Sequence, residues 1–241
     1  MGINFSAFEI GRRALNANQA GINVTGQNIA NVNTPGYSRR RLMLAESAPI
    51  NVHGLNVGNG VSVAGIQSFR DAFIQSRIQA ETGIAGRLTA QRDALGPVEA
   101  ALQGSENGGI ENALANFFGS FRDLEANPGS LPLRSLTAQR GAALASAFQS
   151  TRARLSDIRQ NTDGRLQLSV EQANDLSSRI AELNQKISTA EASGVEASGL
   201  RDQRSELATQ LSEITGARAT ENPDGTMTLS LADGKPLVLG N

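Results

Sequence analysis

The sequence predicts a mainly α protein, an elongated helical bundle or coiled coil with a short β connector and a β-meander at its C-terminal end. Apolar residues recur at spacings of three, four and seven over long stretches, which is typical of amphipathic helices. Only 4% of the residues are aromatic, so aliphatic side chains from these helices must close the core. Short alternating segments bounded by glycine and asparagine indicate strands at residues 46–69 and 217–241.

Composition excludes several classes of function. Lys and Arg number 22 against 23 Asp and Glu, and a dedicated nucleic-acid binder would need a basic excess. There is no cysteine and one histidine, His53, so we expect no metal and no other cofactor. The first residues carry no general secretory signal, and no apolar run is long enough for membrane insertion.

The first helix presents one narrow apolar stripe. Phe8, Leu15, Ile22 and Ile29 recur every seven residues, and small or polar residues fill most of the positions between them. We call these four residues the seam and expect it to pair with one partner helix. Burial of four side chains cannot offset the entropy of ordering the segment, so the helix is marginal by itself. The pattern alone also allows the seam to be part of the core of an intramolecular bundle.

A turn ends this helix. Thr34 precedes Pro35, and a residue before proline is pushed out of the helical region, so the helix should end near Asn33. The segment Thr34–Tyr37 reads as a type II turn in which Gly36 supplies the positive φ. The following Arg39–Arg41 run is expected to be solvated, with contact to acidic neighbouring subunits as the alternative. Alternating apolar residues then predict the strands of the connector: Val52, Leu55, Val57, Val61 and Val63.

The helical period returns from about Arg70 and is expected to kink or break at Gly96-Pro97. A second helix covers residues 110–124, and a loop follows at 127–129. A long helix spans residues 133–190 and carries a coiled-coil-like stripe at its end: Leu166, Ser169, Ala173, Leu176, Ile180, Leu183, Ile187 and Ala190.

A shorter helix, residues 200–214, should form an antiparallel hairpin with the long one and end at Gly216 as its cap. Arg201, Asp202 and Arg204 are expected to form salt bridges on its surface. Turn signals around the alternating residues 226–231 predict the meander. The predicted domains are a terminal assembly segment at 1–45, the β connector at 46–69, a helical body at 70–216 and the meander at 217–241.

The segment from Ala30 to Tyr37 resembles the N-terminal signature of the flagellar rod, hook and hook-associated protein family. Gly58-Asn59-Gly60-Val61, Asp71-Ala72-Phe73-Ile74 and Leu200-Arg201-Asp202-Gln203-Arg204 are similar to further motifs of its hook-associated members. Rod and hook proteins lack the long helical body of residues 70–216. The resemblance assigns an assembly role to the motif residues Ala30, Asn31, Thr34, Pro35, Gly36 and Tyr37.

This resemblance implies a structural subunit without enzymatic activity that joins hook to filament by coupled folding of its terminal helices. Its partners would be other copies of itself, the hook protein, the next hook-associated protein and the flagellar export apparatus. It would lie outside the cell on the flagellum, exported without a cleaved signal peptide. The family pairs its N-terminal helix with a C-terminal helix that does not follow Asn241, so we expect a longer parent protein.

Three alternatives remain open. The chain could be a rod or hook subunit of the same family, or a secreted coiled-coil adaptor or effector that binds a partner helix. A hydrolase would have to use His53, which has no nucleophile elbow nearby. A dinucleotide fingerprint would need glycine where Val63 follows Gly58-Asn59-Gly60.

Overall fold

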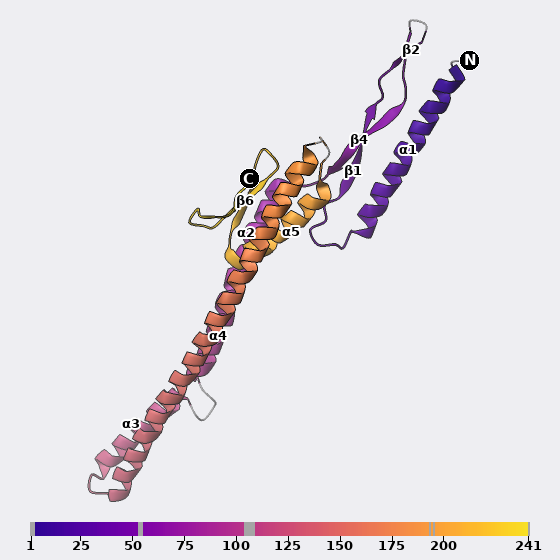
Figure 1. Ribbon diagram of the computed structural model, residues 1–241. Coiled ribbons are helices and arrows are strands. Elements are labelled where there is room, and N and C mark those ends of the chain that lie inside the picture. Colours follow the sequence, from indigo (N-terminus) through magenta and orange to yellow (C-terminus); the bar gives the residue numbers. More distant parts are fainter. Residues whose placement is uncertain (1–2, 53–54, 104–108, 193, 195, 241) are drawn as a thin grey trace. The chain divides into compact units, whose positions relative to one another are not determined.

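The computed structural model describes residues 3–52, 55–103, 109–192, 194 and 196–240. It confirms a mainly α protein with small antiparallel β elements. The described helices are α1 (Ile3–Ala30), α2 (Ala72–Gln103), α3 (Ile110–Ala126), α4 (Leu131–Glu191) and α5 (Ser198–Thr215) (Figure 1). The chain divides into two compact units, unit 1 from Met1–Ala85 and Ala173–Asn241 and unit 2 from Gly86–Gln172.

Unit 1 begins with α1 and a two-stranded ribbon. Strand β1 (Arg40–Glu46) pairs antiparallel with β4 (Val61–Ser68), and β2 (Ile50–Val52) pairs with β3 (Leu55–Val57). We call the β1–β4 pair the ribbon. Its first strand starts at Arg40, inside the segment predicted as the assembly domain, and a bulge interrupts the register between Met43 and Leu44.

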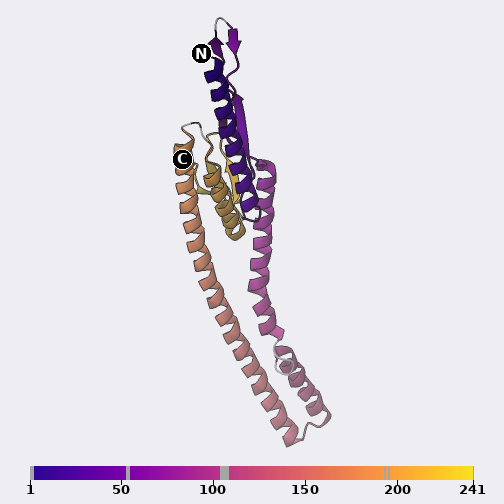
Figure 2. The same ribbon diagram turned by 90° about the vertical axis from the view of Figure 1, so that its right-hand side faces the viewer.

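One face of α1 contacts the ribbon. Ala17 and Val24, seven residues apart, are buried in unit 1. A Cβ atom at Gly60 would lie 3.3 Å from the Cγ2 atom of Ile10, so the chain just before β4 also approaches this face closely. Helix and ribbon run side by side in both views (Figure 2).

The hydrophobic core of unit 1 lies where α4 ends. Its cluster of buried side chains comes from α4, from α5 and from a three-stranded sheet: Leu176, Ile180, Leu183, Leu207, Ala208, Leu211, Met227, Leu229 and Val238. We call this part of unit 1 the α4–α5 core. Helix α5 folds back beside the end of α4, as the sequence predicts (Figure 1). Gly216 caps α5 in the left-handed region at φ 69° and donates its N–H to the Ser212 carbonyl at 2.7 Å.

The predicted meander is confirmed, with strands β5 (Arg218–Glu221), β6 (Met227–Ser230) and β7 (Pro236–Val238) in sequential antiparallel order. It is not separate from the helices, because its inward side chains join the α4–α5 core. The units therefore divide the chain differently from the predicted segments 70–216 and 217–241.

Unit 2 contains α3 together with parts of α2 and α4. Helices α3 and α4 meet where the Thr137 hydroxyl donates to the Ser120 carbonyl at 3.3 Å. A kink or a break was predicted at Pro97, and the helix does not break there, since α2 continues through Pro97 to Gln103. Gly96 has no Cβ to collide with the proline ring, which removes one steric reason for the helix to stop.

Candidate assembly site

The assembly motif forms the predicted turn after α1. Thr34 accepts a hydrogen bond at its carbonyl from the Tyr37 N–H at 3.2 Å, and Gly36 has a φ of 76°. Asn31 donates its side-chain amide to the Gln27 carbonyl at 2.9 Å and accepts the Thr34 hydroxyl at 3.2 Å. The motif is thus a compact hydrogen-bonded corner that leads from the helix into the ribbon.

Asn28 ties this corner to the ribbon, a role that the sequence reading missed. Its amide nitrogen donates to the Arg40 carbonyl at 2.8 Å. Its amide oxygen accepts the Tyr37 hydroxyl and the Arg40 N–H, each at 2.9 Å. Asparagine is a poor residue inside a helix, and its place on the same stripe as Val24 is the signal that could have drawn attention to it. Tyr37 therefore anchors the turn as well as ending the motif.

The remaining motif residues shape the corner. Ala30 is the last residue of α1, and Pro35 takes the second position of the turn. Gly36 lies against α5, since a Cβ at this position would be 3.1 Å from the Cβ of Glu206. The structure therefore brings all six predicted motif residues into one corner, while their role in assembly stays a prediction.

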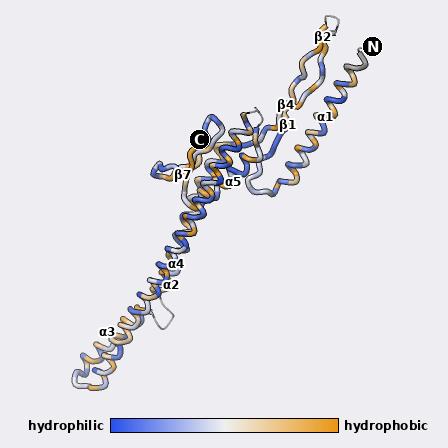
Figure 3. The backbone as a smooth tube through the Cα atoms, in the orientation of Figure 1, coloured by the Kyte–Doolittle hydropathy of each residue, from blue (hydrophilic) through white to orange (hydrophobic). Residues whose placement is uncertain are grey.

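The seam lies on the opposite side of α1 from the ribbon. Phe8, Leu15, Ile22 and Ile29 are 70%, 71%, 72% and 69% exposed. Positions such as 15 and 17, or 22 and 24, are two residues apart and point about 200° apart around a helix. The seam is therefore not part of a core within the described chain. Figure 3 shows apolar residues recurring along α1 between polar ones.

Two arginines at one end of the ribbon converge on α5. Arg40 Nη2 lies 3.3 Å from one carboxylate oxygen of Asp202, and Arg70 Nη2 lies 2.6 Å from the other. The Arg40 guanidinium also stands over the Tyr37 ring, 5.1 Å from its centroid. The expectation of a solvated arginine run is wrong at Arg40, because the ribbon turns this side chain toward α5.

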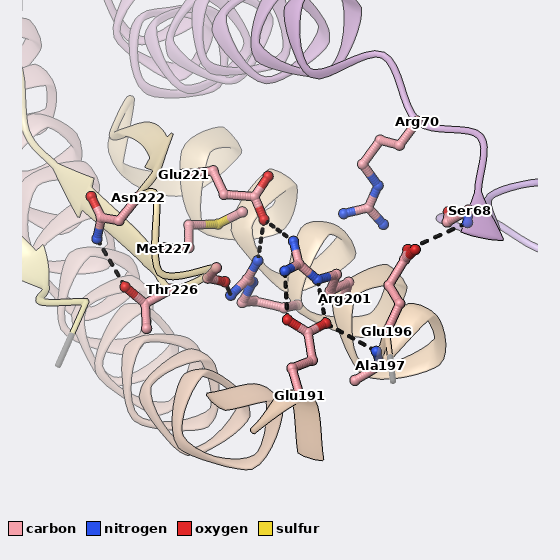
Figure 4. Close-up of polar contacts among 12 residues, drawn as sticks. Ser68, Arg70, Glu191, Glu196, Ala197, Arg201, Glu221, Asn222, Thr226 and Met227 are labelled. Atoms are coloured by element: carbon pink, nitrogen blue, oxygen red, sulfur yellow. Dashed lines mark hydrogen bonds and ion pairs between the residues drawn. The ribbon is translucent and has the colours of Figure 1, made fainter. Parts of the chain in front are cut away.

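A second network joins α4, α5 and the meander, and it corrects the predicted surface salt bridges (Figure 4). Arg204 is fully buried and donates to Asn184 Oδ1 at 2.9 Å, to the Gly225 carbonyl at 2.7 Å and to Glu221 at 2.8 Å. Arg201 donates to both carboxylate oxygens of Glu191, each at 2.7 Å. Helix periodicity placed these side chains at the surface because it contains no information about the sheet that covers them.

The network shifts the pKa values of its members. Hydrogen bonds from Arg201 hold the pKa of the Glu191 carboxyl below its ordinary value of 4.5, and the same pairing raises the pKa of Arg201. Burial lowers the pKa of Arg204. The shifts at Glu191 and Arg201 favour the charged forms of that pair, whereas the shift at Arg204 reflects the desolvation of a buried guanidinium.

Metal binding and membrane insertion can be examined only in the described part of the chain. Among these residues, no three carboxylate or imidazole side chains gather closely enough to hold a metal ion. None of the described helices is sufficiently long and apolar to cross a membrane. His53, on which the hydrolase hypothesis rested, lies outside the described residues.

Comparison with known proteins assigns the family. Residues 95–241 match the family model described as the flagellar hook-associated protein FlgK helical domain, and residues 8–37 match the flagella basal body rod protein model. Together with the helical fold and the corner after α1, these matches define the class as structural proteins of the bacterial flagellum. The chain belongs to the FlgK family of flagellar hook-associated proteins.

Three curated relatives are each called flagellar hook-associated protein 1. The protein of Bacillus subtilis is 30% identical over 237 residues, covering 95% of this chain and 47% of the relative. Those of Escherichia coli and Salmonella typhimurium are each 31% identical over 229 residues, covering 94% of this chain and 42% and 41% of the relatives. The chain thus spans somewhat less than half the length of these relatives.

Proposed function

We propose that this chain is the N-terminal part of a junction subunit between flagellar hook and filament, and that α1 is completed by a helix supplied during assembly. Membership of the hook-associated family supports the place in the flagellum. The single observation that carries the mechanism is the exposed seam on α1. An apolar stripe of this length rarely stays open to water unless another surface covers it.

The seam suits one partner helix. A stripe at seven-residue spacing is the narrow kind that a two-helix coiled coil buries. Full burial of the four side chains would contribute roughly 6 to 12 kcal/mol, before the costs of association are subtracted. The ribbon covers the other face of α1. The helix would therefore become covered on both faces when the assembly supplies the second helix.

Partners and location follow from the same proposal. The subunit contacts other copies of itself, the hook protein and the next hook-associated protein, and serves as a structural part without catalysis. It is exported through the flagellar apparatus to the outside of the cell. A helix with little stability of its own suits this route, because a stable one would resist threading through a narrow channel.

A charge in the seam tests the mechanism. Ile22→Glu is introduced into the chromosomal gene, and Asn16→Glu is the matched control, because it places the same residue at an exposed polar position of α1. Residue 16 points about 100° away from Leu15 around the helix and so lies outside the seam. We expect Ile22→Glu cells to keep their hooks, lose their filaments and stop swimming, because the carboxylate would be buried in the helix pair. Asn16→Glu cells should swim normally.

Electron microscopy of a deletion strain separates the alternatives. Hooks without filaments support a junction subunit, whereas loss of the hooks indicates a rod or hook subunit. Intact filaments would favour a secreted coiled-coil adaptor or effector. Normal swimming of Ile22→Glu cells, with the variant present at its usual level, would contradict the role of the seam.

A further inference from the structure

We propose that α1 and the ribbon form a module that is fastened to the α4–α5 core by a charged joint centred on Asp202. Arg40 is the first residue of β1 and lies opposite Ser68, the last residue of β4. Arg70 follows the end of β4 by two residues, so the two guanidinium groups lie at the same end of the ribbon. They hold opposite oxygens of one carboxylate, at 3.3 Å and 2.6 Å.

The three charged groups are largely removed from water. The side chains of Arg40, Arg70 and Asp202 are 21%, 17% and 9% exposed. Arg40 and Arg70 each keep about a fifth of their side-chain surface in water, so concentrated salt still screens these pairs, and the loss of one partner leaves the others without compensation. Asp202 matters most, because its carboxylate pairs with both positive charges.

The neighbouring contacts across the joint are polar as well. The Ser68 N–H donates to Glu196 at 3.3 Å, which Figure 4 shows beside Arg70. Arg70 Nε donates to the Ser38 hydroxyl at 3.4 Å and so braces the corner from the other side. At Gly36, the corner reaches the side chain of Glu206.

The apolar side chains near the joint are buried within the module and within the α4–α5 core, and the contacts named above between the two are polar. Ala17 and Val24 are buried on the face of α1 that contacts the ribbon. The large cluster takes its members from α4, α5 and the meander. Charges can separate and pair again without exposing either set of apolar side chains to water. The joint therefore lets the module change its angle to the α4–α5 core while both remain folded.

Distances between two spin labels test this joint in the free chain. The chain contains no cysteine, so Ala64→Cys on the ribbon and Glu213→Cys on α5, both exposed, give two unique label sites. We expect a narrow distance distribution in the labelled parent and one at least twice as wide in Asp202→Asn. Asp175→Asn is the matched control, because it removes the same charge from an exposed pair with Arg179 and should leave the width unchanged.

Two further measurements do not depend on the folding of Asp202→Asn. Arg70→Gln changes the ribbon side of the joint, and 1 M NaCl weakens it without any substitution. Both should widen the distribution, while the circular dichroism signal of the helices stays unchanged. A distribution that stays narrow in Arg70→Gln and in high salt, or is already broad in the parent at low salt, overturns the proposal. The joint lies within the isolated chain, so these outcomes do not depend on the role of the chain in the flagellum.

Discussion

Gly36 meets two separate demands within the corner after α1. Its φ of 76° lies in the left-handed region, which costs a residue with a side chain about 1 to 2 kcal/mol. A Cβ there would also lie 3.1 Å from Glu206 Cβ and 3.2 Å from its carboxylate oxygen. Alanine at this position would therefore strain the turn and push it away from α5 at the same time.

We expect Gly36→Ala to weaken the corner by about 1 to 2 kcal/mol. The amides of Tyr37 and Arg40 report on it, because they donate to the Thr34 carbonyl and to Asn28. Their hydrogen exchange should become roughly ten-fold faster. Gly129→Ala is the control, since no other atom lies within 4 Å of the Cβ it would add. Equal exchange in both variants would contradict this account of the turn.

Arg204 is the residue on which the attachment of the meander depends. Arg204→Met keeps the length of the side chain but leaves the Gly225 carbonyl without this donor and Glu221 with Arg201 alone. We expect the free energy of unfolding of unit 1 to fall by about 2 to 4 kcal/mol. It can be measured from the urea dependence of amide exchange in β6.

The matched control for this prediction is Arg179→Met, because Arg179 is half exposed and pairs with Asp175 one helical turn away. Such exposed pairs contribute little, so its effect should stay within about 0.5 kcal/mol. A loss of similar size in the two variants would mean that the buried network adds nothing specific to the stability of the sheet.

Helix α4 shows that an apolar stripe in the sequence predicts which face of a helix can be buried, but not how much of that face is buried. Its stripe runs without interruption from Leu166 to Ala190 in the sequence, yet the buried part begins only at Leu176. Ile180 is fully buried, whereas Leu166 is 62% exposed. Periodicity identifies the face that can be covered. The position of α5 and the meander decides where along that face the cover lies.

Alanine substitutions at Ile180 and Leu166 test which part of the α4 stripe is covered. Ile180→Ala should destabilise unit 1 by about 2 to 5 kcal/mol, because it leaves a cavity among tightly packed side chains. Leu166→Ala changes an exposed side chain of the same helix and should cost less than about 0.5 kcal/mol. Urea unfolding followed by circular dichroism measures both. A large effect of Leu166→Ala would indicate a partner surface on that part of α4 even in the free chain.

Local chemistry explains which elements the sequence could predict. Proline, glycine and heptad spacing specify the corner, the cap at Gly216 and the long helices, because each depends on residues close together in the chain. The joint at Asp202 could not be read in this way. Arg40 and Asp202 are 162 residues apart. The residues next to each of them in the sequence do not indicate which side chain it will pair with. Pro97 is a case in which a local signal misled the prediction of a possible break, because α2 continues through this proline.

For the whole molecule, the decisive contrast is between the two faces of α1. Val24, on the ribbon side, is 5% exposed, whereas Ile22, two residues earlier, is 72% exposed. The α4–α5 core is built from two helices and a sheet, whereas α1 packs mainly against the ribbon within the described residues. The free energy of local opening should therefore be far smaller in α1 than in the end of α4.

Hydrogen exchange of the free chain should find the amides of α1 at least a hundred-fold less protected than those around Ile180. Val24→Ala should lower protection in α1 further, because it removes most of a side chain that is buried against the ribbon. Ile22→Ala should leave exchange in the free chain unchanged and weaken only the assembled state, where the seam is covered. If α1 were as protected as α4 in a solitary chain, or if Ile22→Ala loosened it there, the seam would already have a partner within the subunit. The helix would then have no need of a neighbouring helix to complete it.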